Sequence, residues 1–168
     1  MWEQYRLGEE SDLIDIASTD EHRRAATALA GQCRRELLLL SRELAPEVYD
    51  IPGFAEAVRR LALSGRGLSV RILVWEPRSL TGSGHRLLEL SQRLSSFIQL
   101  RVPAEEHREF SQAFLVADER GYIHQPLADR YEAQLCFNGP ARARELKHRF
   151  ELFWEKAVPD PELRRQHL

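Results

Sequence analysis

The sequence has little cysteine and almost no lysine. Cys33 and Cys136 lie far apart, and the chain has no Cys-x-x-Cys pair and no Cys/His ligand spacing. Two buried free thiols suit a reducing compartment, so we expect a cytoplasmic protein. Of the 24 cationic side chains only Lys147 and Lys156 are lysine. A biased base composition of the gene explains such an excess of arginine; the alternative is bidentate recognition of anions, for which arginine is the better residue.

Long apolar runs and a strong net charge are also lacking. The longest apolar stretch, Leu37 to Leu40, is too short to cross a bilayer, and the acidic start of the chain is unlike a secretory signal. A net charge of −2 gives no overall basic field for nucleic acid or an anionic membrane, although a local patch stays open. The 168 residues, 43% hydrophobic and 30% charged, fit one globular domain. We expect no membrane partner.

Hydrophobic periodicity predicts an α/β order of elements. The run 36–42 is typical of a central strand buried on both faces, and with the helix from Pro52 and the strand 68–75 it forms a βαβ unit with parallel strands. The sequence AspGluArgGly at 118–121 predicts a hairpin turn. The other predicted strands are 97–102, 114–117, 122–124 and 133–137, and short strands are expected at 5–7 and 13–16. The other predicted helices are 20–33, 86–94 and 140–157. Residues 46–52 are expected to be a connection.

Several segments carry a resemblance through their order and spacing. They are GluLeuLeuLeuLeuSer at 36–41, GlyArgGly at 65–67 before ValArgIleLeuVal at 70–74, PheLeuValAlaAsp at 114–118 and PheGluLeuPheTrp at 150–154. In this order the chain resembles one half of a phospholipase-D-like protein. The resemblance implies an α/β fold with a mixed sheet flanked by helices on both faces. It divides the chain into an N-terminal extension (1–35) whose helix packs on the domain, the phospholipase-D-like domain (36–158) and a tail (159–168).

The catalytic signature of that family is absent. The family uses His-x-Lys followed, after four further residues, by Asp; aligning on Asp118 places Ser111 at the histidine and Ala113 at the lysine, and no His-x-Lys occurs anywhere in the chain. The family reaction needs an imidazole that attacks phosphorus and a lysine charge that stabilises the phosphate oxygens. We therefore expect no phosphodiesterase activity, and a structural turn role for Asp118.

Two further stretches, 154–164 and 84–88, resemble an uncharacterised bacterial branch of this fold. In that branch the domain occurs alone or joined to a GNAT-type acetyltransferase domain, which implies an accessory role with an acetyltransferase as partner. In the resembling family two halves pack around a two-fold axis, which implies a homodimer here.

Polar residues follow two predicted strands. ThrGlySerGlyHisArg at 81–86 stands at a helix N-terminus, where a phosphate or carboxylate can bind; an ordinary capped helix start is the alternative. HisGlnProLeuAlaAspArg at 124–130 lies, by the resemblance, near the catalytic pocket; alternatively, Asp129 and Arg130 form only a surface ion pair. The candidate ligand-binding residues are Arg78, Ser83, His85, Arg86, Ser111, Asp118, His124, Gln125, Asp129 and Arg130.

No metal site or cofactor is expected, because the acidic stretch 105–109 lacks the second histidine of HExxH. The function that the sequence favours is a non-catalytic phospholipase-D-like module that binds a protein partner or a small anion. The alternative is a nucleic-acid-binding domain that uses the arginine-rich helical face at 142–149. An enzyme of another type, using Ser111 or His85, lacks a base and an orienting partner in the sequence.

Overall fold

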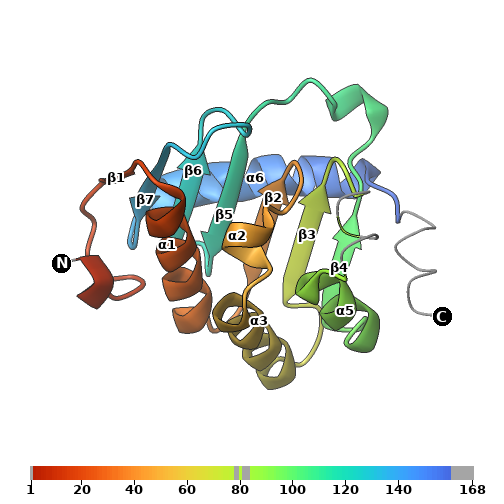
Figure 1. Cartoon of the computed structure of the whole chain (residues 1–168), viewed down its shortest axis with the longest axis horizontal. Coiled ribbons are helices and arrows are strands. Elements are labelled where there is room, and N and C mark those ends of the chain that lie inside the picture. The colour runs from red at the N-terminus through yellow and green to blue at the C-terminus, as the bar shows by residue number, and fades with distance from the viewer. Residues whose placement is uncertain (1, 78–79, 81–83, 160–168) are drawn as a thin grey trace.

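The computed structural model describes residues 2–77, 80 and 84–159, and it contains one seven-stranded mixed sheet. The strand order is β1-β7-β6-β5-β2-β3-β4 (Figure 1). The strands are β1 (Ile14–Ile16), β2 (Leu37–Ser41), β3 (Val70–Val74), β4 (Ile98–Arg101), β5 (Ala113–Ala117), β6 (Gly121–Gln125) and β7 (Ala133–Cys136). The helices are α1 (Thr19–Gln32), α2 (Pro46–Tyr49), α3 (Pro52–Ser64), α5 (Arg86–Arg93) and α6 (Pro140–Lys156), with short 3-10 turns at Trp2–Gln4 and Glu105–His107.

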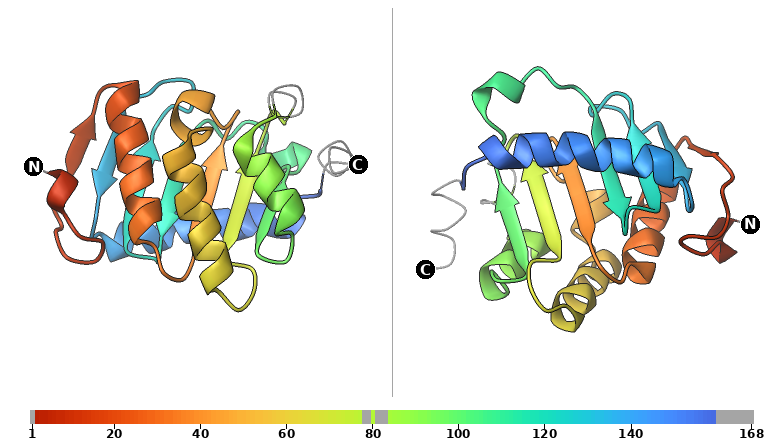
Figure 2. Two further views of the ribbon diagram at one scale, coloured as in Figure 1. Left: turned by 60° about the horizontal axis from the view of Figure 1, so that its bottom comes forward. Right: turned by 180° about the vertical axis from the view of Figure 1, so that it is seen from behind.

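Helices cover both faces of the sheet. Helices α1, α2, α3 and α5 lie on one face, and the long helix α6 crosses the other (Figure 2). Each face has its own hydrophobic core, and the central strand β2 contributes to both: Leu37 and Leu39 to the first, Leu38 and Leu40 to the second. Alternate side chains of a strand point to opposite faces, so a strand covered on both sides is apolar throughout.

The sheet divides into a parallel and an antiparallel half at β2. Strands β2, β3 and β4 are parallel, while β5 pairs antiparallel with β2 and continues through β6 and β7 to the edge strand β1. The β5–β6 connection is the predicted hairpin, with positive φ at Asp118 (54°) and Glu119 (55°). The residue after this turn is Gly121. A larger residue is disfavoured there, because a Cβ would lie 2.6 Å from Leu7 Cδ1 and 3.2 Å from the Cys136 carbonyl oxygen.

Helix α1 begins at a reciprocal cap. The Ser18 hydroxyl accepts a hydrogen bond from the Glu21 amide (3.1 Å), and the Glu21 carboxylate accepts one from the Ala17 amide (3.2 Å). Its buried stripe consists of His22, Ala25, Ala26, Leu29 and Ala30, and it packs against α2, α3 and the antiparallel half of the sheet. The N-terminal segment therefore contributes both a covering helix and, through β1, an edge strand.

The mixed α/β architecture with helices on both faces is as the sequence predicts, and two local predictions are wrong. Residues 5–7 form no strand: Leu7 donates its N–H to the Gln32 side chain (2.7 Å), which in turn donates to the Tyr5 carbonyl (3.0 Å), so a side chain replaces a strand partner. The connection 46–52 contains the short helix α2, which starts at Pro46. Within the described ranges no helix combines the length and hydrophobicity that a bilayer crossing requires.

Candidate ligand-binding site

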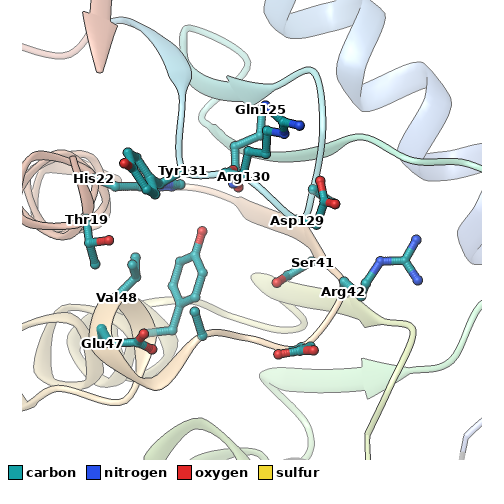
Figure 3. A pocket seen from close by; sticks show the side chains of 14 residues that line it. Thr19, His22, Ser41, Arg42, Glu47, Val48, Gln125, Asp129, Arg130 and Tyr131 are labelled. Atoms are coloured by element: carbon teal, nitrogen blue, oxygen red, sulfur yellow. Dashed lines mark hydrogen bonds between the residues drawn. The ribbon is translucent and has the colours of Figure 1, made fainter. Parts of the chain in front are cut away.

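A pocket of about 300 Å³ lies where β2 and β6 end and α1 begins. Strands β2 and β6 are both antiparallel to β5, so their carboxyl ends meet at one edge of the sheet, where ligands of open α/β sheets commonly bind. Figure 3 shows the side chains around this space. The lining residues are Thr19 and His22 from α1; Ser41, Arg42, Glu43 and Ala45 after β2; Glu47, Val48 and Tyr49 from α2; and Gln125, Ala128, Asp129, Arg130 and Tyr131 from the β6–β7 connection.

The deepest polar groups of the pocket are neutral. His22, Tyr49 and Ser41 are only 3%, 5% and 9% exposed. Burial lowers the pKa of His22 to about 4 and raises that of the Tyr49 hydroxyl, so both are uncharged near pH 7. The two rings meet edge to face with centroids 6.3 Å apart. The Ser41 hydroxyl accepts a hydrogen bond from the Leu44 amide (2.9 Å), which leaves its own proton to donate.

The rim carries charges of both signs. The Arg42 guanidinium extends away from the pocket centre and pairs with Glu76 at 3.3 Å (Figure 3). The Gln125 side-chain amide donates to the Arg130 carbonyl (2.7 Å) and so holds the β6–β7 connection in place. Asp129, Arg130 and the ring of Tyr131 are exposed at the mouth.

The pocket adjoins Ser111, one of the candidate residues named from the sequence. The amide of Ala128, a lining residue, donates to the Ser111 carbonyl at 2.7 Å. Asp118 lies at the other end of β5, where its carboxylate accepts hydrogen bonds from the amides of Arg34 (2.9 Å), Arg35 (2.8 Å) and Glu36 (2.9 Å). The Cys33 thiol also donates to it at 3.2 Å. Asp118 thus ties the α1–β2 connection to the hairpin and lies away from the pocket.

The structure brings some candidate residues of the second polar stretch together and separates one. Gln125, Asp129 and Arg130 line the pocket. His124 does not, because neighbouring residues of a strand face opposite sides of the sheet. Its ring nitrogen Nε2 lies 2.8 Å from the Gln112 side-chain oxygen and 3.4 Å from Arg142 on α6.

His85 and Arg86 are engaged elsewhere. His85 caps α5: its Nδ1 accepts from the Leu87 amide (3.2 Å), so Nε2 carries the proton and donates to the Leu44 carbonyl (3.0 Å). Burial lowers the pKa of this imidazole. Arg86 pairs with the Asp50 carboxylate (3.1 Å) and carbonyl (2.9 Å). Arg78 and Ser83, with the first half of the predicted anion loop 81–86 (residues 81–83), lie outside the described residues.

Sequence reasoning missed His22 and Tyr49 as pocket residues. The available signal for His22 was its position three and four residues before Ala25 and Ala26, on the apolar stripe of α1. For Tyr49 no signal existed, because α2 itself was not predicted. In the part of the chain that the structure describes, no three His, Cys, Asp or Glu side chains gather as metal ligands would.

The basic residues of α6 are largely compensated. Arg142 and Arg144 pair with Glu145 (3.4 Å) and Glu119 (3.8 Å). Lys147 bridges Glu36 (2.8 Å) and Glu119 (3.1 Å), and the Arg149 guanidinium lies 5.0 Å from the centre of the Phe110 ring. The predicted arginine-rich face therefore presents little unbalanced positive charge.

Comparisons with known proteins identify the fold. The model of a domain of unknown function, DUF7931, matches residues 18–166. No curated protein matches the sequence. Among solved structures, Nuc from Salmonella typhimurium, a phospholipase D family member, has a TM-score of 0.63 at 13% identity over 88% of this chain and 97% of its own. NucT from Helicobacter pylori has a TM-score of 0.60 at 14% identity over 90% of this chain and all of its own.

A third similar structure is TrmBL2, an archaeal chromatin protein with a novel mode of DNA binding. Its TM-score is 0.66 at 15% identity, and the match covers 94% of this chain but 56% of the archaeal protein. The chain thus spans little more than half of that protein's length. At such identities these likenesses show the shared fold.

Proposed function

Because the chain belongs to the DUF7931 family and has the phospholipase-D-like fold, we propose that it is a non-catalytic module that binds a small polar ligand at the β2–β6 edge. One observation carries the proposal. A pocket of about 300 Å³ adjoins Ser111, which the sequence resemblance aligns with the family's histidine, and the chain has no His-x-Lys pair.

The residues beside the pocket do not offer the pair of an imidazole and an ammonium that phosphodiester transfer by the family's route requires. Ala113 offers a methyl group where the family has an ammonium. The two lysines, Lys147 and Lys156, both belong to α6, which covers the face of the sheet opposite the pocket-lining helices α1 and α2. His22 is the imidazole in the pocket, and no lysine accompanies it.

A hydrolysis assay tests this part of the proposal. We expect no turnover of bis-p-nitrophenyl phosphate above the buffer rate at pH 5 to 8. Turnover that is lost in His22→Phe and kept in Thr27→Val would overturn it, because it would show that an imidazole from α1 has taken over the chemistry.

A thermal-shift screen tests ligand binding. The compounds are phosphates, nucleotides, short DNA and RNA, acyl-CoA, nucleosides and sugars. A ligand at a hundred-fold excess over its Kd stabilises the native state by about 2.7 kcal/mol. Gln125→Ala, which removes a lining side chain, is expected to abolish the shift. Gln134→Ala is the matched control: Gln134 pairs with His124 across β6 and β7, so it shares that residue's face, opposite Gln125. Equal shifts in both variants would place the ligand elsewhere.

Nucleic-acid binding is the second candidate, and the structural likeness to an archaeal DNA-binding protein is what favours it. The compensated cations of α6 argue against it. Electrostatic binding to DNA weakens by orders of magnitude between low and physiological salt. Binding of duplex DNA with such a salt dependence, lost in the double variant Arg142→Ala, Arg144→Ala, would replace the proposed function with this one.

Two partners are proposed from the family resemblance, namely a second copy of the chain and an acetyltransferase. A homodimer would be expected to elute as twice the 19.5 kDa of the chain in size-exclusion chromatography with light scattering. A 19.5 kDa species at high protein concentration would exclude it. An acetyltransferase partner stays a prediction.

A further inference from the structure

Tyr49 presents an unused hydroxyl to the pocket at the β2–β6 edge. The side chain comes from α2, is 5% exposed and lines the space. Its hydroxyl has no hydrogen-bond partner in the described part of the chain. Unlike the enclosed Nε2 of His22, this hydroxyl is open to the pocket. Most buried polar groups have a partner, so a group on a ligand can supply the one that the fold does not.

The donors on two of the lining side chains are already engaged. The Gln125 side-chain nitrogen donates to the Arg130 carbonyl (2.7 Å), which leaves the amide oxygen of Gln125 as a free acceptor. The Arg42 guanidinium is paired with Glu76 at 3.3 Å and points away from the pocket centre (Figure 3). A ligand therefore meets acceptors that lack a donor more than donors that lack an acceptor.

Carboxylates also outnumber the guanidinium that remains. Glu43, Glu47 and Asp129 line the pocket, against the exposed side chain of Arg130. Glu47 and Asp129 come from opposite sides of the space (Figure 3), and neither has an ion-pair partner within the described ranges. A cleft with an excess of one sign of charge attracts ligands of the opposite sign.

A primary ammonium group matches both properties. It carries three N–H donors, no acceptor and a positive charge. A phosphate or carboxylate would bring further acceptors and further negative charge, and a quaternary ammonium would have no N–H to offer Tyr49 or Gln125. The ring of Tyr131, 50% exposed at the mouth, adds an aromatic face, which attracts cations.

The volume limits the ligand to a small molecule, because about 300 Å³ is the lower end of the range for such sites. We propose that the pocket binds a small organic molecule through a primary ammonium group. The ammonium donates to the Tyr49 hydroxyl and is balanced by the carboxylates of Glu47 and Asp129. This inference rests on the proposed function, since it names the ligand class of the same pocket.

Two sets of compounds that differ only in their end group test the ligand class. One set is putrescine, butane-1,4-diol and succinate; the other is tyramine, tyrosol and 4-hydroxyphenylacetate, all measured by calorimetry at pH 7. We expect the amine of at least one set to bind at least tenfold more tightly than its alcohol and its acid. Tighter binding of an alcohol or acid would overturn the inference and leave the proposed function standing. Absence of binding in both sets would also overturn it; the proposed function would then fail only if the wider screen found no ligand at the pocket.

Three variants test the residues. Tyr49→Phe removes the hydroxyl and keeps the ring against Phe54, and Glu47→Gln removes a charge at constant size. We expect each to weaken binding of the amine at least tenfold, the effect of one hydrogen bond to a charged group. Glu132→Gln is the matched control, because Glu132 is exposed beside Tyr131 and does not line the pocket. Melting curves check that each variant is folded. Wild-type affinity in both Tyr49→Phe and Glu47→Gln, or an equal loss in Glu132→Gln, would overturn the assignment.

Discussion

Replacing Asp118 with asparagine should destabilise the protein without affecting the pocket. The carboxylate accepts three backbone hydrogen bonds at 2.8–2.9 Å from residues 34–36, and it lies at the end of β5 away from the pocket. Asparagine fits the same space and tolerates the positive φ of 54°. The substitution therefore removes the negative charge and one acceptor oxygen while it leaves the turn conformation possible.

The magnitude follows from the hydrogen bonds. Each hydrogen bond to a charged group contributes roughly 1.5–3 kcal/mol. Arg34 and Arg35 are exposed, so water can accept part of the backbone hydrogen bonding that the asparagine side chain no longer accepts. We expect Asp118→Asn to lower the free energy of unfolding by about 2–3 kcal/mol, which is roughly 4–12 °C in Tm for a chain of this length. Asp118→Ala should lose about 1 kcal/mol more, because alanine is strained at this φ.

Urea unfolding at pH 7 measures both variants. Asp129→Asn is the control: an exposed carboxylate at the pocket rim should change stability by no more than about 0.5 kcal/mol. A loss below about 0.5 kcal/mol in Asp118→Asn would refute the reasoning, since the carboxylate would then not be what joins the α1–β2 connection to the hairpin. Loss of ligand binding in folded Asp118→Asn would also contradict it.

Three further predictions concern the core. Burial gives His22 a pKa of about 4 in the folded protein against about 6.5 when unfolded, so the unfolded state binds more protons between these pH values. The free energy of unfolding should therefore fall by about 3 kcal/mol as the pH drops from above 6.5 towards 4. Urea titrations should show a weaker fall in His22→Phe. Arg71→Lys should cost about 1–2 kcal/mol in urea unfolding, because Arg71 binds Glu151 through two nitrogens (2.6 and 2.8 Å), which lysine cannot do; an unchanged midpoint would contradict this. Gly121→Ala should lower Tm through a cost of about 1–3 kcal/mol, because its Cβ would overlap Leu7; a Tm at or above wild type would show that Leu7 moves aside freely.

Most of the fold could be predicted from the sequence because its long elements carry strong periodic signals. The run LeuLeuLeuLeu at 37–40 is apolar on both faces since helices cover both sides of β2. The short elements could not be predicted. Helix α2 has four residues, too few to show a period, and the conformation of residues 5–7 depends on Gln32, a partner some 25 residues away.

The candidate site was predictable only in part. Gln125, Asp129 and Arg130 were identifiable as polar residues after a predicted strand. The separation of His124 from them follows from strand alternation, once the strand is known to continue to Gln125. His22 joins the pocket through the packing of α1 against the sheet, and no local pattern specifies which strand ends a helix will cover.

The place of β1 in the sheet has a consequence for synthesis of the chain. Ile14 pairs with Leu135, so the edge strand meets its partner only after roughly 120 further residues have been made. At about 5–20 residues per second this interval is roughly 6–24 s. Strands β2, β3 and β4 can pair during this interval, because they are close together in the sequence. Strand β1 cannot pair until β7 has been made. A nascent chain stalled before β7 would therefore leave the β1 segment open to proteases, although it was translated first.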